Sequence, residues 1–492
     1  MRYEILPTRA AATNSVDAPT HVCLPARLRK RTALTVPALV AAMFLGACTP
    51  GPKQETITRA STTALEMPGM VASSGGLTQP QARRRVASNA EIARDFVELS
   101  FNLESGRPIA NLSRFEGPVT VRTTGAVPAT APAELARLLA RLRSEANIDI
   151  AASQSPDASI TVEFVPRRTM SAAVPNAACF VVPNVTSWEQ YKRVRGTAVT
   201  DWTQVSVRTH ATVFVPSDTA PQEVRDCLHE EVAQGLGPLN DLYRLPDSIF
   251  NDDNFNTTLT AHDMAVLKVY YARELRSGMT PQQVQALLPQ VLARVNPAGG
   301  PTSGAGKASP TPQIFVATLE KAMGPRASNR ARQDFARQAV AMAAAQGWHD
   351  TRAGFAWFAL GRLTMQDAPK TALTAFLNAG AIYRATPGAG IQAAHVDMQL
   401  AKVALANGRA QEAIQLVNRS TGAALENENP ALMATLLLIR AEAYEMLGND
   451  QLSRQARLDS ASWARYGFGS DAAVRQRSAE VAALANAGSR RN

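Results

Sequence analysis

Hydrophobic and polar positions change their spacing along the chain and divide it into three stretches. Residues 83–285 combine apolar positions at helical spacing with short alternating runs, whereas residues 313–480 keep helical spacing almost throughout. Apolar residues recur every three to four positions in an amphipathic helix, but alternate in a half-buried strand. The pattern therefore predicts an α+β domain followed by an all-α domain. The stretch Asn296–Gln313 is rich in Gly, Pro and Ser without a period, which predicts a linker at residues 286–312.

Helices and short strands alternate within the predicted α+β domain. One helix is expected to start at a capping box formed by Thr219 and Gln222, and to end at Gly235 or Gly237. Another is expected from about Thr260 to Tyr271. The other expected elements are a helix after the cap candidates Ser88 and Asn89, a helix near residues 131–149, and strands near residues 117–125, 159–166, 179–183 and 211–218.

The all-α domain repeats itself. Ala359–Phe376, Leu400–Val417 and Arg440–Leu458 align with a step of about forty residues, and each has a polar or Gly turn between two helical stretches. Small residues at fixed points allow close contact between helices, and helical hairpins must stack to bury their apolar faces. The pattern resembles tetratricopeptide-like repeats, and an unrelated Ala-rich bundle is the alternative. Either architecture predicts a scaffold without catalytic residues.

The N-terminal segment has the features of an export signal. The basic stretch Arg27–Arg31 precedes an apolar run that ends in small residues and Cys48. The sequence Leu-Gly-Ala-Cys resembles a bacterial lipobox, which predicts a signal peptide over residues 1–47 and a lipid anchor on Cys48. A plain signal peptide is the alternative. Thr49 is compatible with outer-membrane attachment, and the Thr-, Ser-, Gly- and Pro-rich residues 48–82 predict a flexible tether. We therefore expect a periplasmic, membrane-anchored protein.

Charge and cysteine content agree with this compartment. The net charge of +10 includes +4 from residues 1–47, which leaves about +6 spread along the remaining chain. This dispersed excess, without a basic-aromatic signature, argues against nucleic acid as a partner. Once the leader cysteine and Cys48 are set aside, Cys179 and Cys227 remain, and in an oxidising periplasm they are expected to form a disulfide.

The helix after Thr219 carries the sequence CLHEEVAQGLGPLND, which resembles a damaged zinc-protease motif. The zinc motif H-E-x-x-H places two imidazoles on one metal and a Glu beside them as general base. Counted from His229, the second ligand would be Ala233, and helical geometry points His229 toward solvent. Counted from Glu230, the pattern becomes Glu230-Glu231-x-x-Gln234, in which both histidines are replaced. Glu231 still holds the place of the base, on the apolar stripe of the helix.

Several separate motifs together resemble the domain-of-unknown-function family 2927. They are SNAEIARDFVELSFNLESG, RFEGPVTV, DCLHEEVAQGLGPLNDLYRLPDSIFNDDNF and LTAHDMAVLKVYY, and they span about residues 85–285 in this order. The family is similar to zincin metallopeptidases with an altered metal motif. The resemblance implies a zincin-like fold, with a small mixed sheet, an active-site helix and a helical part after it. It implies no established activity.

Two functions follow from these features and stay open at this point. In the first, Glu230 and Glu231 are structural, the loop Asn251–Asn254 is an ordinary solvated loop, and the protein is a lipoprotein that binds an envelope protein through residues 313–480. In the second, Glu230, Gln234 and Asp241 hold a divalent metal for a hydrolase in which Glu231 is the catalytic base. Oxygen ligands favour Ca²⁺, Mg²⁺ or Mn²⁺ over zinc. The loop Asn251–Asn254 and the pair His262-Asp263 are further candidate ligands.

Overall fold

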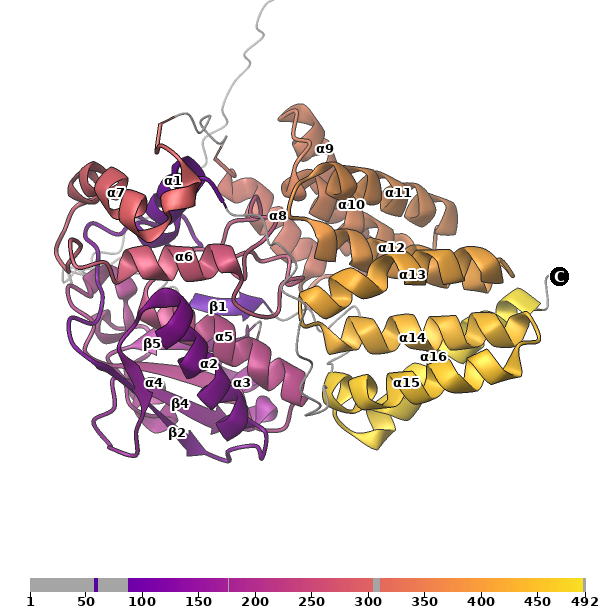
Figure 1. Cartoon of the computed structure of the whole chain (residues 1–492), viewed down its shortest axis with the longest axis horizontal. Coiled ribbons are helices and arrows are strands. Elements are labelled where there is room, and N and C mark those ends of the chain that lie inside the picture. The colour runs from indigo at the N-terminus through magenta and orange to yellow at the C-terminus, as the bar shows by residue number, and fades with distance from the viewer. Residues whose placement is uncertain (1–56, 61–86, 176, 304–309, 490–492) are drawn as a thin grey trace, which may run out of the picture. The chain divides into compact units, whose positions relative to one another are not determined.

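A mixed sheet organises the first half of the chain. The computed structural model describes residues 57–60, 87–175, 177–303 and 310–489 (Figure 1). The strands are β1 (Ile57–Ala60), β2 (Val119–Gly125), β3 (Ile150–Ala152), β4 (Ile160–Val165), β5 (Ala177–Pro183) and β6 (Ala211–Pro216). Their order in the sheet is β1-β5-β6-β4-β2-β3. The pairs β2–β3, β2–β4 and β4–β6 are parallel, whereas β5 runs antiparallel to both β6 and β1.

Seven helices accompany this sheet in the described residues. They are α1 (Asn89–Ser100), α2 (Ala131–Ala146), α3 (Arg167–Ala173), α4 (Trp188–Val194), α5 (Pro221–Leu236), α6 (Ala261–Tyr270) and α7 (Pro281–Val295). Ser88 and Thr260 cap α1 and α6 through complete capping boxes, in agreement with the predicted starts of both helices. The predicted capping box of α5 is wrong, because Ala220 is its N-cap residue and the Thr219 hydroxyl donates to Glu223 instead.

One apolar core joins the sheet to its helices. Strands β4, β5 and β6 are buried along nearly their whole length, so α5 packs on β5 and β6 with one face and on α2 with another. Helix α7 continues past residue 285 and places Val284, Leu288 and Leu292 in the same core, beside α1 and α6. We refer to β1 through α7 as the α+β part.

The second half of the described chain is helical. It contains α8 (Gln313–Met323), α9 (Asn329–Ala345), α10 (Thr351–Thr364), α11 (Pro369–Ala385), α12 (Gly390–Ala406), α13 (Ala410–Glu426), α14 (Pro430–Met446), α15 (Asp450–Phe468) and α16 (Asp471–Ser489). The three predicted repeat segments fall on the hairpins α10–α11, α12–α13 and α14–α15, which stack side by side (Figure 1). We call α8 through α16 the helical array. The α+β and all-helical classes are thereby confirmed.

The loop between α5 and α6 links the two parts. Tyr243 and Phe255 leave this loop and join the apolar core of the helical array, where Phe255 meets Phe358 edge to face. The hydroxyl of Thr351 donates to the Tyr243 carbonyl at 2.6 Å. Among the helices that the structure describes, none combines the length and apolar character needed to cross a bilayer.

Candidate functional site

Helix α5 carries the sequence-predicted site and is enclosed on all sides. A helix that packs between a sheet and other helices has no solvent face, whatever its polar pattern. His229 is therefore only 5% exposed, and the Leu259 N–H donates to its Nδ1 at 3.1 Å. Burial, reinforced by the nearby Arg141, holds the pKa of His229 well below its usual range. The prediction that His229 points toward solvent is wrong, because the α6 side of the chain covers that face.

The side chains of the predicted metal motif lie in the interior. Glu230 is 5% exposed, whereas Glu231 and Gln234 are fully buried. The Gln234 side-chain amide donates to Asp241 Oδ2 at 3.4 Å, so the structure brings two of the proposed ligands together. The other end of this amide, Gln234 Oε1, is a buried acceptor with no hydrogen-bond partner among the described residues.

A metal would need more than this pair. Gln234 Oε1 fits a hard cation, because an amide oxygen is a normal ligand for Ca²⁺ or Mg²⁺. Within the described residues, however, no three His, Cys, Asp or Glu side chains lie close enough to share a metal ion. The contact of Gln234 with Asp241 is the part of the proposed ligand set that the structure shows directly.

The end of α5 is held by an arginine from a different segment. Arg208 is buried, and its guanidinium donates to the carbonyls of Gln234, Gly235 and Gly237 at 2.7, 2.8 and 2.7 Å. These are carbonyls that a helix leaves without partners at its C-terminus. Gly237 is the C-cap residue, one of the two predicted helix ends. Arg208 thus fixes the backbone on which Gln234 and the following turn depend.

The predicted disulfide is present. Cys179 of β5 and Cys227 of α5 are bonded, with their Cα atoms 6.0 Å apart. The bond ties the antiparallel strand of the sheet to the helix that carries Glu230 and Glu231. Cys48, the predicted lipid anchor, lies outside the described residues.

The loop Asn251–Asn254 is enclosed rather than solvated. Asn251 and Asp253 are buried, and their side chains serve the loop itself: Asn251 Nδ2 donates to the Leu245 carbonyl and to Asp253 Oδ2. Asp253 also accepts from the Phe255 N–H at 3.0 Å and lies 3.4 Å from Gln392 Nε2 of the helical array. Burial raises the pKa of Asp253 to about 7. A solvated loop is therefore the wrong description, because the loop is enclosed at the junction with the array.

Asp263 likewise has a structural role. Its carboxylate accepts from the Ser248 hydroxyl at 2.5 Å, from the Ile249 N–H at 3.0 Å and from the Thr260 N–H at 2.8 Å. These bonds complete the cap of α6 and hold the preceding loop against it. Its neighbour His262 instead faces a pocket, which the sequence did not predict.

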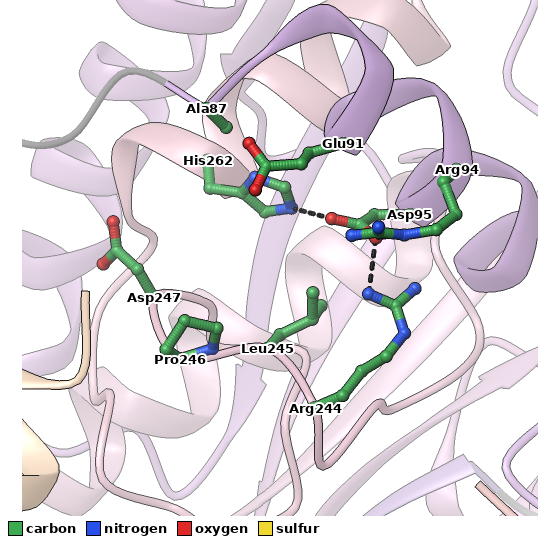
Figure 2. Close-up of a pocket in the computed structure, with 9 residues that line it drawn as sticks. All are labelled: Ala87, Glu91, Arg94, Asp95, Arg244, Leu245, Pro246, Asp247 and His262. Carbon is green, nitrogen blue, oxygen red and sulfur yellow. Dashed lines mark hydrogen bonds and ion pairs between the residues drawn. The ribbon is translucent and has the colours of Figure 1, made fainter. Parts of the chain in front are cut away.

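This pocket lies between α1, the start of α6 and the loop after α5. It encloses about 130 Å³. Its lining residues are Ala87, Glu91, Arg94, Asp95, Arg244, Leu245, Pro246, Asp247 and His262 (Figure 2). Glu230, Glu231 and Gln234 are not among them. The structure therefore separates the sequence-predicted site on α5 from the pocket that it forms.

Asp95 is the central residue of the pocket. Figure 2 shows its carboxylate between His262 and Arg244. Arg244 Nη1 and Arg94 Nε both donate to Asp95 Oδ1, at 2.6 and 3.0 Å, whereas Asp95 Oδ2 lies 3.5 Å from His262 Nε2. Arg244 also donates to Glu98 at 2.7 Å. The side chains of Asp95, Arg244 and His262 are each less than a tenth exposed.

One sequence signal could have identified this cluster. Asp95 is placed three residues after Ile92 and four before Leu99, on the apolar face of α1. A carboxylate on such a face must find a partner in the interior. Its partners Arg244 and His262 lie some 150 residues away in the chain, and the sequence alone does not bring them together.

Comparison with known proteins agrees with the motif resemblance. No curated protein and no solved structure matches the chain. Residues 89–290 match a family model described as a protein of unknown function (DUF2927). The matched stretch runs from α1 into α7 and includes both α5 and nearly all of the pocket lining. The match supports the resemblance to the DUF2927 family over residues 89–290.

Proposed function

We propose that the protein is a lipid-anchored bacterial envelope protein that binds or scaffolds a protein partner. In this proposal Cys48 carries the lipid, the DUF2927 domain has a degenerate zincin-like fold, and tetratricopeptide-like repeats in the helical array recruit the partner in the periplasm. The outer membrane is the favoured site of attachment. The observation that carries the proposal is the stack of hairpins α10 to α15, joined to the α+β part through Tyr243 and Phe255.

Two further features support binding over catalysis. Glu231 has no exposed surface, and a general base must reach a substrate or a water. The helical array also exposes large apolar side chains, among them Leu377 at 50% and Leu458 at 70%. Exposed apolar residues on a stacked helical surface are suited to contact with a partner protein.

A capture experiment tests the partner-binding role. Full-length protein is purified from detergent-solubilised envelopes, and co-purifying proteins are compared between wild type, Leu377→Glu and Lys370→Glu. Both substitutions place a carboxylate on an exposed position of α11, but only the first removes an exposed apolar side chain. We expect Leu377→Glu to lose the partner and Lys370→Glu to retain it. Equal capture by all three proteins would contradict binding through this face.

Membrane attachment is tested separately. Cys48→Ser removes the thiol that a lipid would modify. We expect the variant to appear in the soluble fraction after cell disruption, while the wild type sediments with membranes. Sedimentation of both proteins would exclude Cys48 as the anchor.

The contact between Gln234 and Asp241 favours a second function, a hydrolase with a non-standard metal site. Glu230, Gln234 and Asp241 would hold a divalent metal there, and Glu231 would act as base. Metal analysis of protein purified without chelators, together with peptide cleavage assays of wild type and Glu231→Gln, separates the two functions. Stoichiometric metal, with cleavage that Glu231→Gln abolishes, would establish the hydrolase. A metal-free wild type without cleavage would exclude it.

A further inference from the structure

We propose that the pocket around Asp95 and His262 binds a primary ammonium group carried on a short aliphatic chain. The pocket belongs to the α+β part, and the inference goes beyond partner binding by the helical array. It is built from three segments: α1 supplies Asp95, the loop after α5 supplies Arg244, and the first turn of α6 supplies His262 (Figure 2).

Two polar atoms, Asp95 Oδ2 and His262 Nε2, face each other in the pocket. Both guanidinium contacts of Asp95 go to Oδ1, so Oδ2 is directed at His262 Nε2. The 3.5 Å between Oδ2 and Nε2 is too long for a good hydrogen bond. His262 Nε2 is accordingly buried without a hydrogen-bond partner in the described part of the chain. Such an atom destabilises the folded protein unless a ligand or water satisfies it.

These two atoms determine the chemistry of a ligand that would contact both of them. An atom placed against Oδ2 and Nε2 must donate to the carboxylate, and it can also donate to Nε2 when the imidazole proton is on Nδ1. An ammonium group offers three N–H donors and no acceptor, which suits two acceptors at this separation. A carboxylate ligand would instead be repelled by Asp95.

The side chains that line the pocket have an excess of negative charge. Among the described lining residues, Glu91, Asp95 and Asp247 are acidic and Arg94 and Arg244 are basic, so the formal charge with neutral His262 is −1. Glu98, which accepts from Arg244 behind the pocket, adds another negative charge. In a partly enclosed site this balance favours a cation over an anion.

The pocket is small and has one apolar side. Ala87, Leu245 and Pro246 give the pocket an apolar wall that methylene groups can contact. Its volume of about 130 Å³ is well below that of a site for a drug-sized ligand. A free alkylamine or the side chain of a partner's lysine has the required combination of head group and short apolar stem.

Calorimetric titration of the full-length protein tests the proposal, with n-butylamine, 1-butanol and butyrate as probes. We expect butylamine to bind at least about tenfold more tightly than either of the other two, because only it donates to both Asp95 and His262 with a positive charge. Equal binding of butylamine and butanol, tighter binding of butyrate, or no butylamine binding at millimolar concentration would each overturn the proposal.

Variants locate the binding. His262→Phe removes Nε2 and keeps a ring, and we expect it to weaken butylamine binding about tenfold. His349→Phe, at an exposed histidine outside the pocket, is the matched control and should bind like wild type. Ala87→Phe narrows the pocket without removing a polar group, so it provides a second test if His262→Phe does not fold. Unchanged butylamine affinity in both pocket variants would overturn the site.

Comparison of butylamine with a lysine derivative identifies the source of the ammonium group. Tighter binding of Nα-acetyl-lysine amide than of butylamine would support a lysine side chain of a partner protein. The reverse order would support a free amine. Either order is compatible with failure of the capture experiment on Leu377, because that experiment examines the helical array.

Discussion

At the scale of single residues, buried polar groups determine how α5 ends. Arg208 satisfies three carbonyls at its C-terminus, and its guanidinium also lies 4.7 Å from the Trp202 ring centre. Burial lowers the pKa of Arg208, but the contacts to partial negative charge at the helix end compensate for its lost hydration. The backbone around Gln234 therefore depends on a residue outside the α5 segment.

Replacement of this residue gives a prediction at the same scale. Arg208→Ala should lower the free energy of unfolding by on the order of 4 kcal/mol, because three buried carbonyls lose a charged donor. Urea denaturation followed by circular dichroism measures the change. Arg168→Ala, at an exposed arginine, is the control and should change stability by less than about 0.5 kcal/mol. Similar losses in the two variants would contradict the capping role.

The sequence predicted correctly the features of residues whose partners are close in the chain or few in number. The pairing of Cys179 with Cys227 followed from the small number of remaining cysteines, and the start of α6 near Thr260 followed from the change from a polar loop to an apolar run. It failed for His229, because a helical polar face predicts solvent only when nothing else packs on it. It also missed the contact of Asp95 with Arg244, since such long-range pairs arise from the tertiary fold alone.

At the scale of elements, small residues set how closely the hairpins of the array pack. Gly354 and Gly361 of α10 face α11, and a Cβ atom on either would lie 2.6 or 2.7 Å from the rings of Tyr383 or Phe376. The repeat pattern predicted close contact at small residues, and α10–α11 has this geometry. What the pattern did not give is which aromatic side chain fills the space above each glycine.

Two glycine-to-alanine substitutions test this packing. Gly361→Ala should destabilise the protein by about 1–3 kcal/mol, because the new methyl group displaces the Phe376 ring. Gly422→Ala, within α13 and with no atom near its added Cβ, should stabilise it by up to about 1 kcal/mol through helix propensity. Thermal unfolding of both variants measures the effect. Stabilisation of both variants would show that packing at Gly361 is loose.

At the scale of the whole described molecule, the loop after α5 connects the two parts through enclosed polar contacts. Gln392 of α12 donates to the Pro246 carbonyl at 2.7 Å and approaches Asp253. Arg225 of α5 donates to the Glu428 carbonyl at 2.9 Å, and the Tyr466 hydroxyl bonds to Glu134 of α2. The sequence predicted a linker at residues 286–312, but it gave no sign that a second connection runs through the loop at 243–255.

Asp253 makes this junction sensitive to pH. Its pKa is about 7 in the folded protein, because of burial, and near 3.8 when exposed. Since the folded state binds the proton more tightly, the contribution of Asp253 to stability is fully present below about pH 4 and is lost as the pH rises through 7. Buried His395, with its pKa lowered to about 3, acts in the opposite direction below pH 6.5. We therefore predict the free energy of unfolding of an Asp253 variant relative to that of wild type.

We compare the free energy of unfolding of Asp253→Asn with that of wild type at pH 5 and at pH 8. The difference should shift in favour of the variant by a few kcal/mol at the higher pH. Urea denaturation at the two pH values measures this double difference, in which the histidine contribution cancels. Asp157→Asn, at an exposed carboxylate outside this loop, should show none. An Asp253→Asn stability difference that is independent of pH would contradict a protonated carboxylate at the junction.

The disulfide has a consequence for chain connectivity. Cys179 and Cys227 are 48 positions apart, and the bond closes a covalent ring that contains most of β5, all of α4 and β6, and the start of α5. Arg193 and Arg195 are exposed on this ring, at the end of α4. A tryptic cut there would leave one covalent molecule, which separates into two fragments only on reduction. A nick within the ring therefore leaves the central strand β6 attached to its neighbours through both the sheet and the sulfur bridge.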